Sequence, residues 1–191
     1  MSSYVSSLST YFGRIRQFER QDWLVYVLWV GLMCGLTGVT LAFCLAARHA
    51  GAPLPGIAWL VPVGAAIFTG AIAVDTIGHR TVYKEAIARA EGLVHAVTIF
   101  CGITSCVLLC AAYGQRELFF IPATVFTVLS FVYSLVDEGF HWHRYYTSRS
   151  DAVETWSHVH ILIGHGVMMG AWWIWAYTGY AGVAETLAVF A

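Results

Sequence analysis

The sequence contains little charge for its length. Charged residues make up 11% of its 191 residues, whereas 59% of the residues are hydrophobic. A soluble domain carries roughly 25% charged residues, so this composition favours a bundle of membrane-spanning helices. The net charge is −1 and no basic stripe is present, which excludes the charge pattern of a nucleic-acid-binding protein. We therefore expect an integral membrane protein with a lipid bilayer, and not nucleic acid, as its surroundings.

Cysteine pairs suited to disulfides or zinc sites are also lacking. The five cysteines lie inside apolar runs and none belongs to a CxxC motif, so we interpret them as small buried hydrophobic residues. We also expect no cleavable signal peptide. The apolar run that follows residues 1–22 covers about 25 residues, which is too long for the core of a signal peptide and long enough to cross a bilayer.

Five apolar stretches are long enough to cross a bilayer as helices. The sequence therefore predicts an all-α, polytopic membrane bundle that forms a single domain over residues 1–191. Residues 1–22 are expected to be a cytoplasmic N-terminal segment that contains a short interfacial helix. Two connections are short and nearly uncharged, and the other two are longer and charged. The predicted spans are 23–47, 56–76, 92–113, 118–137 and 156–178.

Positive charge is distributed unevenly between the two predicted sides of the membrane. Eight basic residues fall on the side of the N-terminus and the two long loops, against Arg48 and Arg116 on the other side. By the positive-inside rule the N-terminus is cytoplasmic and the C-terminus is outside, and we expect the membrane to be a bacterial inner membrane. The apolar tail 179–191 is expected to lie along the membrane or against a partner subunit. The eight basic residues are Arg14, Arg16, Arg20, Arg80, Lys84, Arg89, Arg144 and Arg149.

The segment DEGFHWHRYY, residues 137–146, repeats an earlier pattern. DTIGH begins at Asp75 and is followed by EGLVH from Glu91, whereas DEGFH begins at Asp137 and is followed by ETWSH from Glu154. Each copy places Asp-x3-His at the end of one span and Glu-x3-His at the start of the next. We infer an internal duplication. Its two parallel two-helix repeats cover residues 56–113 and 118–178.

The repeated motifs predict a metal centre. Residues four apart project from one face of a helix, so the motifs form four carboxylate–imidazole pairs at one depth, at the cytoplasmic ends of four spans. Ionisable groups near hydrocarbon are costly and should face the bundle interior. Carboxylates and imidazoles on facing helices are the ligands of di-iron and di-manganese sites, and without thiolates they suit iron, manganese, zinc or copper(II). We predict two metal ions and favour iron over the other metals. The ligands are His79, His95, His141 and His158, then Glu91, Glu154, Asp75 and Asp137.

Four further residues are candidates for the same site. His165 follows His158 by seven residues on the same helix stripe, about 10 Å deeper in the membrane, where it could ligate a more buried metal or donate to substrate. Glu138 could replace the aspartate that precedes it. His143 and His160 would point elsewhere on regular helices and are weaker candidates; His143 also has no counterpart in the first copy of the repeat.

The paired motifs resemble those of the C subunit of copper membrane monooxygenases, the particulate methane and ammonia monooxygenases. DTIGHRTVYKE and VDEGFHWHRYY, each followed by a later histidine, are similar to that family's two Asp/Asn-x3-His motifs over residues 70–170. Glu91 and Glu154 depart from the family pattern and favour a harder metal such as iron. The resemblance implies partner membrane subunits and a copper site formed by Asp75, His79 and His95, or by Asp137, His141 and His158.

These features favour a membrane-embedded dinuclear-metal oxidoreductase, with iron as the favoured metal, that uses O2 to hydroxylate, desaturate or otherwise oxidise a lipid-like or small apolar substrate. An electron-donor protein would then be a partner. Two alternatives stay open. A b-type cytochrome or electron-transfer subunit would hold haem b between histidines of two spans, which leaves the four carboxylates unexplained. A metal-binding accessory or transport protein would use the same ligands transiently, although no acidic residue continues into the outer halves of the spans.

Overall fold

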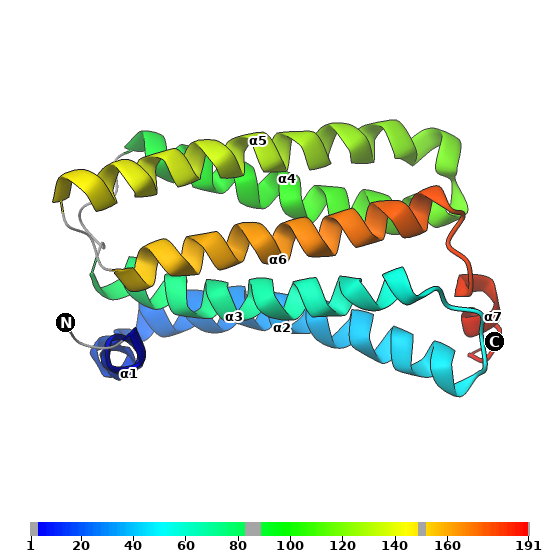
Figure 1. Cartoon of the computed structure of the whole chain (residues 1–191), viewed down its shortest axis with the longest axis horizontal. Helices are drawn as coiled ribbons and strands as arrows, with labels where there is room; N and C mark the ends of the chain where they lie inside the picture. Colours follow the sequence, from blue (N-terminus) through cyan, green and yellow to red (C-terminus); the bar gives the residue numbers. More distant parts are fainter. Residues whose placement is uncertain (1–3, 83–88, 149–151, 191) are drawn as a thin grey trace.

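The computed structural model of the chain describes residues 4–82, 89–148 and 152–190. Within these ranges the chain forms α-helices and two short 3-10 helices and no strand, which confirms the predicted all-α class (Figure 1). Five helices are long and apolar enough to cross a membrane. The elements are α1 (Tyr4–Gly13), η1 (Arg14–Gln17), α2 (Arg20–His49), η2 (Gly56–Trp59), α3 (Leu60–Thr81), α4 (Arg89–Gly114), α5 (Arg116–Ser148), α6 (Ala152–Tyr177) and α7 (Val183–Leu187).

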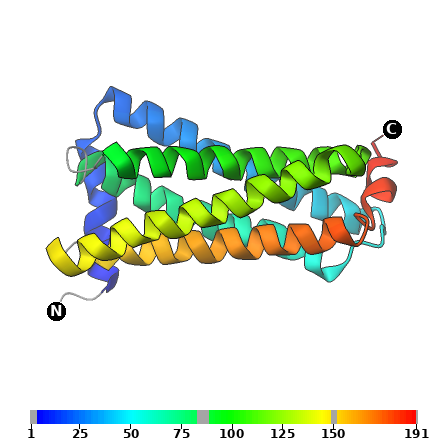
Figure 2. The same cartoon turned by 90° about the horizontal axis from the view of Figure 1, so that it is seen from above.

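The five long helices run side by side and alternate in direction, with α1 across one end of the bundle and α7 at the other (Figures 1 and 2). Helix α3 packs mainly on α6, and α4 packs mainly on α5. The two pairs meet through smaller contacts of α6 with α4 and α5. Helix α2 packs on α3 and, in the described part of the chain, does not contact α4.

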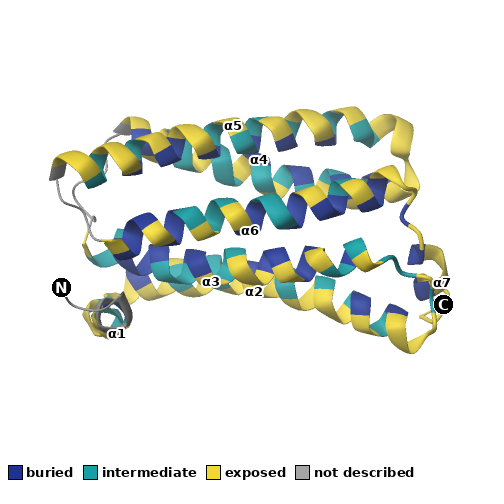
Figure 3. Cartoon of the chain, viewed as in Figure 1, coloured by how far each residue is buried: buried dark blue, intermediate teal, exposed yellow. Residues whose placement is uncertain are grey.

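Buried positions gather on α3 and α6, whereas the outward faces of the other long helices are exposed (Figure 3). The exposed side chains on these faces are mainly apolar, for example Leu28 on α2 and Ile121 on α5. Continuous apolar surface of this kind suits contact with lipid. The five spans therefore describe an integral membrane protein whose inner helix pair is α3 and α6.

Helix α1 crosses the bundle end and is held by buried contacts. Tyr11 is buried, and its hydroxyl occupies the space that a side chain at Gly78 would need. At the same end, the buried carboxylate of Asp22 on α2 accepts a hydrogen bond of 2.7 Å from Arg80 Nε on α3. The helix predicted for the N-terminal segment is confirmed, and these contacts attach it and the start of α2 to the end of α3.

The segment after residue 137 differs from the prediction. Four of the long helices extend beyond the predicted spans by up to about one turn, but α5 continues to Ser148 and includes most of the segment that we expected to be a loop. The helix can leave the apolar region because its ionisable side chains His141 and Arg144 find carboxylate partners inside the bundle. The end of the apolar stretch therefore did not predict the end of helix α5.

The C-terminal tail contacts the end of the bundle: the Tyr180 hydroxyl donates to the carbonyl oxygen of Leu109 at 2.5 Å. Its predicted contact with the membrane or a partner subunit stays a prediction. Burial raises the pKa of Tyr180 to about 12, so the phenol stays a donor at neutral pH. Gly182 adopts φ +84° and lies against the backbone of Leu54, a left-handed conformation that favours glycine. The tail thus covers the end of the bundle opposite α1.

Candidate metal centre

A cluster of acidic and imidazole side chains lies inside the bundle at the end where α1 crosses it. The i, i+4 spacing of the motifs turns each pair to the inward face of its helix, and the alternating helix directions bring all four helices to one level. The five carboxylates of the cluster are all buried. Its members are Asp75 and His79 on α3, Glu91 and His95 on α4, Asp137, Glu138, His141 and Arg144 on α5, and Glu154 and His158 on α6.

Two pairs of the cluster join neighbouring helices. Nε2 of His158 on α6 lies 3.0 Å from Oδ1 of Asp75 on α3. Nδ1 of His95 on α4 lies 3.1 Å from Oδ2 of Asp137 on α5. These two contacts occupy equivalent positions in the predicted repeats, although the duplication itself stays a prediction. In each contact the imidazole of one repeat's Glu-x3-His motif thus faces the aspartate of the other repeat.

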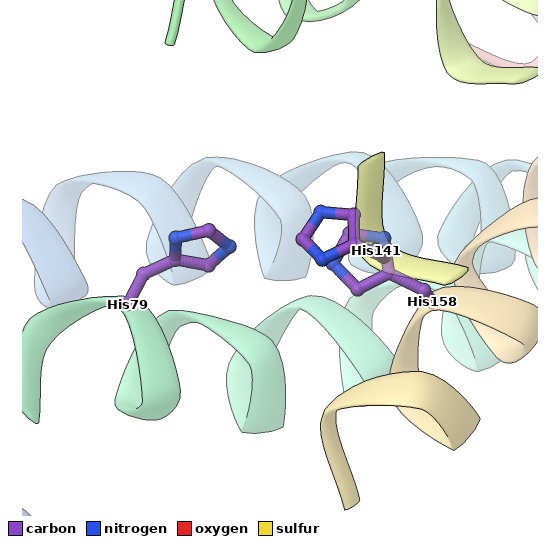
Figure 4. Close-up of side chains that lie close together, drawn as sticks. All are labelled: His79, His141 and His158. Atoms are coloured by element: carbon purple, nitrogen blue, oxygen red, sulfur yellow. The ribbon is translucent and has the colours of Figure 1, made fainter. Parts of the chain in front are cut away.

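The remaining imidazoles lie within the same group. His79 Nε2 is 3.4 Å from Asp75 Oδ2, one helical turn away. His141 Nδ1 is 3.0 Å from Glu154 Oε1 on α6. The rings of His79, His141 and His158 point toward one another (Figure 4), and one nitrogen from each lies within 4.8 Å of the others. This buried triad could hold a metal ion.

Two buried polar atoms of the cluster have no hydrogen-bond partner among the described residues. They are Asp137 Oδ1 and His141 Nε2, and they lie 3.8 Å apart. Glu91 Oε1 lies 3.9 Å from the same histidine nitrogen. Nδ1 of the same ring lies 3.0 Å from Glu154 Oε1 and 2.9 Å from Arg144 Nη2. In the tautomer whose Nδ1 donates to Glu154, Nε2 has a free lone pair, as in metal-ligating histidines. Oxygen and nitrogen donors in this arrangement suit a cation between them.

The charge of the cluster also favours bound cations. Five carboxylates and one guanidinium, that of Arg144, give it a net charge of −4 when the imidazoles are neutral. The other nearby guanidinium that the structure describes, Arg80, is already paired with Asp22 outside the cluster. Uncompensated buried charge is costly. Two divalent ions would bring the cluster to neutrality.

Arg144 is a member of the cluster that the sequence analysis missed. Its Nη2 and Nη1 donate to the two oxygens of Glu91 at 2.7 and 3.2 Å, and Nη2 lies 3.0 Å from Glu154 Oε1. The sequence analysis used this arginine only to orient the chain. The signal was present, because residues 137, 141 and 144 follow the i, i+4, i+7 spacing of one helix stripe. Recognising this spacing required helix α5 to continue past the predicted span.

The four additional candidates differ in position. Glu138 joins the cluster through a contact of 3.2 Å between its Oε1 and His158 Nδ1. His165 is buried deeper in the bundle on α6. His143 and His160 are exposed and lie outside the cluster, and His160 Nδ1 is bonded to the carbonyl oxygen of the preceding turn. Of these four, the structure therefore brings only Glu138 to the other ligand candidates.

An apolar cavity of about 490 Å³ opens from the cluster and runs along the bundle. Asp75, Asp137 and His158 line one end, and the remaining wall is mostly apolar, with Leu36 from α2 and Ile103 from α4 among its side chains. Its size falls within the range of roughly 300–1,000 Å³ typical of small-molecule sites. Sequence patterns could not reveal it, because cavity-facing and lipid-facing residues are both apolar.

Comparison of the chain with protein-family models, with curated proteins and with solved structures gave no match. The interpretation of the site therefore depends on its own chemistry.

Proposed function

We propose that the chain is a membrane-embedded oxidoreductase that holds two metal ions and uses O2 to oxidise a lipid-like or small apolar substrate. Iron is the metal that we favour. The observation that carries this proposal is the apolar cavity that ends at a buried carboxylate–imidazole cluster. A purely structural hydrogen-bond network would not need a cavity of substrate size at its edge. A water-soluble substrate would not need an apolar one.

In this proposal the imidazoles and carboxylates ligate the metals, and hydrogen bonds between these side chains orient the ligands. Iron bound at the site would supply the O2 binding and redox chemistry that side chains lack. His79, His141 and His158 form the nitrogen donor set, and the aspartates of the two repeats, 75 and 137, supply oxygen donors. Glu154 Oε1 and Arg144 Nη2 lie 3.0 and 2.9 Å from Nδ1 of His141, so these two side chains would hold the orientation of that ring.

The cavity would orient the substrate and exclude water. Its apolar wall holds a hydrocarbon segment, and its polar end brings a C–H bond of that segment next to the cluster. In a hydroxylation, one atom of O2 enters the C–H bond and the other leaves as water. Two electrons and two protons must then come from a donor, which we propose to be an electron-donor protein at the α1 end of the bundle.

The other metals and the haem alternative are weighed by the same contacts. Copper, which the family resemblance implies, is the second choice, followed by manganese and zinc, because five carboxylates favour a hard cation. Each of the four cluster imidazoles has a carboxylate oxygen within 3.4 Å. A haem between two of these rings would leave the acids uncompensated, so the contacts favour metal ions over haem b.

The test is metal analysis of the purified protein, with an absorption spectrum, for the wild type and two variants of α6. His158→Ala removes a buried cluster imidazole, and His160→Ala removes an exposed imidazole outside it. We expect about two iron ions per chain in the wild type and in His160→Ala, and loss of most iron in His158→Ala. A folded wild-type protein without metal would contradict the proposal. A stoichiometric Soret band would favour the haem alternative.

A further inference from the structure

His165 lies apart from the metal cluster, in the wall of the apolar cavity. It follows His158 by seven residues on α6, which places it about 10 Å further along the helix. Its ring stacks on Phe131 of α5 at a centroid distance of 4.4 Å and an angle of 11°, and on Phe68 of α3 at 5.6 Å. These two contacts fix the plane of the imidazole.

The ring nitrogens of His165 have no hydrogen-bond partner among the described residues, and the residue is only 5% exposed. A buried polar group without a partner is costly, and such groups in folded proteins normally have a protein, water or ligand partner. The carboxylates that line the cavity lie toward its other end: Asp75 is seven residues along α3 from Phe68, and Asp137 and Glu138 are six and seven residues along α5 from Phe131, which is about two helical turns. The imidazole therefore offers one donor and one acceptor to a mostly apolar space.

The cavity also has an apolar opening. It is lined by α2 and α4, which do not contact each other in the described part of the chain. The lining side chains Leu32 and Val39 of α2 and Val107 of α4 are exposed on the outer, lipid-facing surface. A long apolar molecule could therefore enter sideways from the bilayer between these helices.

We infer that His165 is a specificity-determining residue, which hydrogen-bonds a neutral hydroxyl or carbonyl group of a long-chain substrate that enters from the bilayer. The role of this molecule as the substrate rests on the proposed function. Its binding beside His165 is independent of that function. The polar group would lie at His165 while the chain reaches the cluster about 10 Å away. A carboxylate is disfavoured, because a buried charge needs an ion-pair partner and no arginine or lysine of the described residues lines the cavity.

The experiment measures binding without turnover. The protein in nanodiscs is cross-linked to a hexadecanol that carries a mid-chain diazirine, and cross-links are mapped by mass spectrometry. Hexadecanol, hexadecane and palmitate compete with this probe. We expect hexadecanol to protect the cavity about tenfold better than hexadecane, because one buried hydrogen bond contributes about that factor to the affinity. Palmitate should protect no better than hexadecane. Equal protection by all three, or best protection by palmitate, would overturn the inference.

Two variants assign the preference to the imidazole. His165→Phe keeps the ring stacking and should reduce the preference for hexadecanol to about onefold, whereas His165→Gln keeps a donor and an acceptor and should retain most of it. His160→Phe on the same helix should behave as the wild type. A preference that survives in His165→Phe would contradict the inference. Metal content is measured in the same samples, so loss of the proposed metal centre is seen independently of the binding result.

Discussion

Arg144 is the only arginine or lysine among the described residues of the cluster, and it contacts both of the glutamates that the Glu-x3-His motifs supply. Its place in the predicted repeat corresponds to Val82, so it makes the two halves of the centre unequal. A guanidinium is always charged and forms two parallel hydrogen bonds with one carboxylate. We interpret it as a fixed internal counter-ion, which lowers the charge that bound metal must compensate.

Replacing Arg144 should separate folding from metal binding. In Arg144→Gln, Glu91 and Glu154 lose their cation, and breaking a buried ion pair costs about 3–5 kcal/mol. We expect a lower unfolding temperature in the presence of a chelator, and a larger increase on adding iron than the wild type shows, because an added cation replaces the lost charge. Thermal unfolding of the purified protein measures both.

Arg144→Lys is the matched control for this variant. It keeps the charge but cannot bind Glu91 through two nitrogens, so its effect should be the smaller of the two. If Arg144→Gln unfolds at the wild-type temperature without metal, the arginine does not act as an internal counter-ion.

At the scale of elements, α3 and α6 cross with their backbones in close contact. Gly64 on α3 and Gly164 on α6 face each other so closely that a side-chain carbon on either would collide with the backbone of the other helix. Small residues at a crossing of this kind let membrane helices pack backbone to backbone. This contact sets the distance between Asp75 and His158, the cluster residues that the same two helices carry.

Glycine-to-alanine changes on α6 test this contact. Gly164→Ala should destabilise the protein by about 1–3 kcal/mol, because the crossing must widen to admit the methyl group. Gly170→Ala on the same helix meets open space and should be neutral or slightly stabilising, since alanine favours helix by about 1 kcal/mol over glycine. Thermal unfolding of the two variants is the measurement. Equal unfolding temperatures would show that α3 and α6 do not need the close crossing.

For the whole molecule, an odd number of spans places α1 and α7 at opposite ends of the bundle. The candidate metal centre lies at the α1 end, and the C-terminal tail covers the other end. The excess of arginine and lysine near the α1 end predicts that this end is cytoplasmic. An electron donor in the cytoplasm would then reach the end of the bundle that carries the cluster.

Cysteine labelling tests this orientation. Gln115→Cys, at the short connection between α4 and α5, should react in intact cells with a membrane-impermeant maleimide. Tyr146→Cys, exposed near the far end of α5, should react only after the cells are opened. The unsubstituted chain, whose native cysteines lie within the spans, supplies the background. The reverse labelling pattern would place the cluster on the outer side.

Much of the fold followed from the sequence alone. Length and apolarity determined the five spans, because backbone groups in a bilayer must be paired within their own helix. The Asp-x3-His and Glu-x3-His spacing determined which side chains share a helix face, and so which residues could meet at one level. Asp75, His79, Asp137 and His158 were therefore foreseeable as neighbours before any helix was placed.

Only the tertiary structure decided how these helices pair. It placed His158 against Asp75 and His95 against Asp137, and it brought Arg144 into the cluster by extending α5. It also separated the wall of the cavity, where His165 lies, from the surface that faces lipid. The physical reason is that all faces of such helices are apolar, so periodicity does not distinguish a lipid contact from a helix contact. Close packing at positions such as Gly164 makes that distinction, and packing exists only in three dimensions.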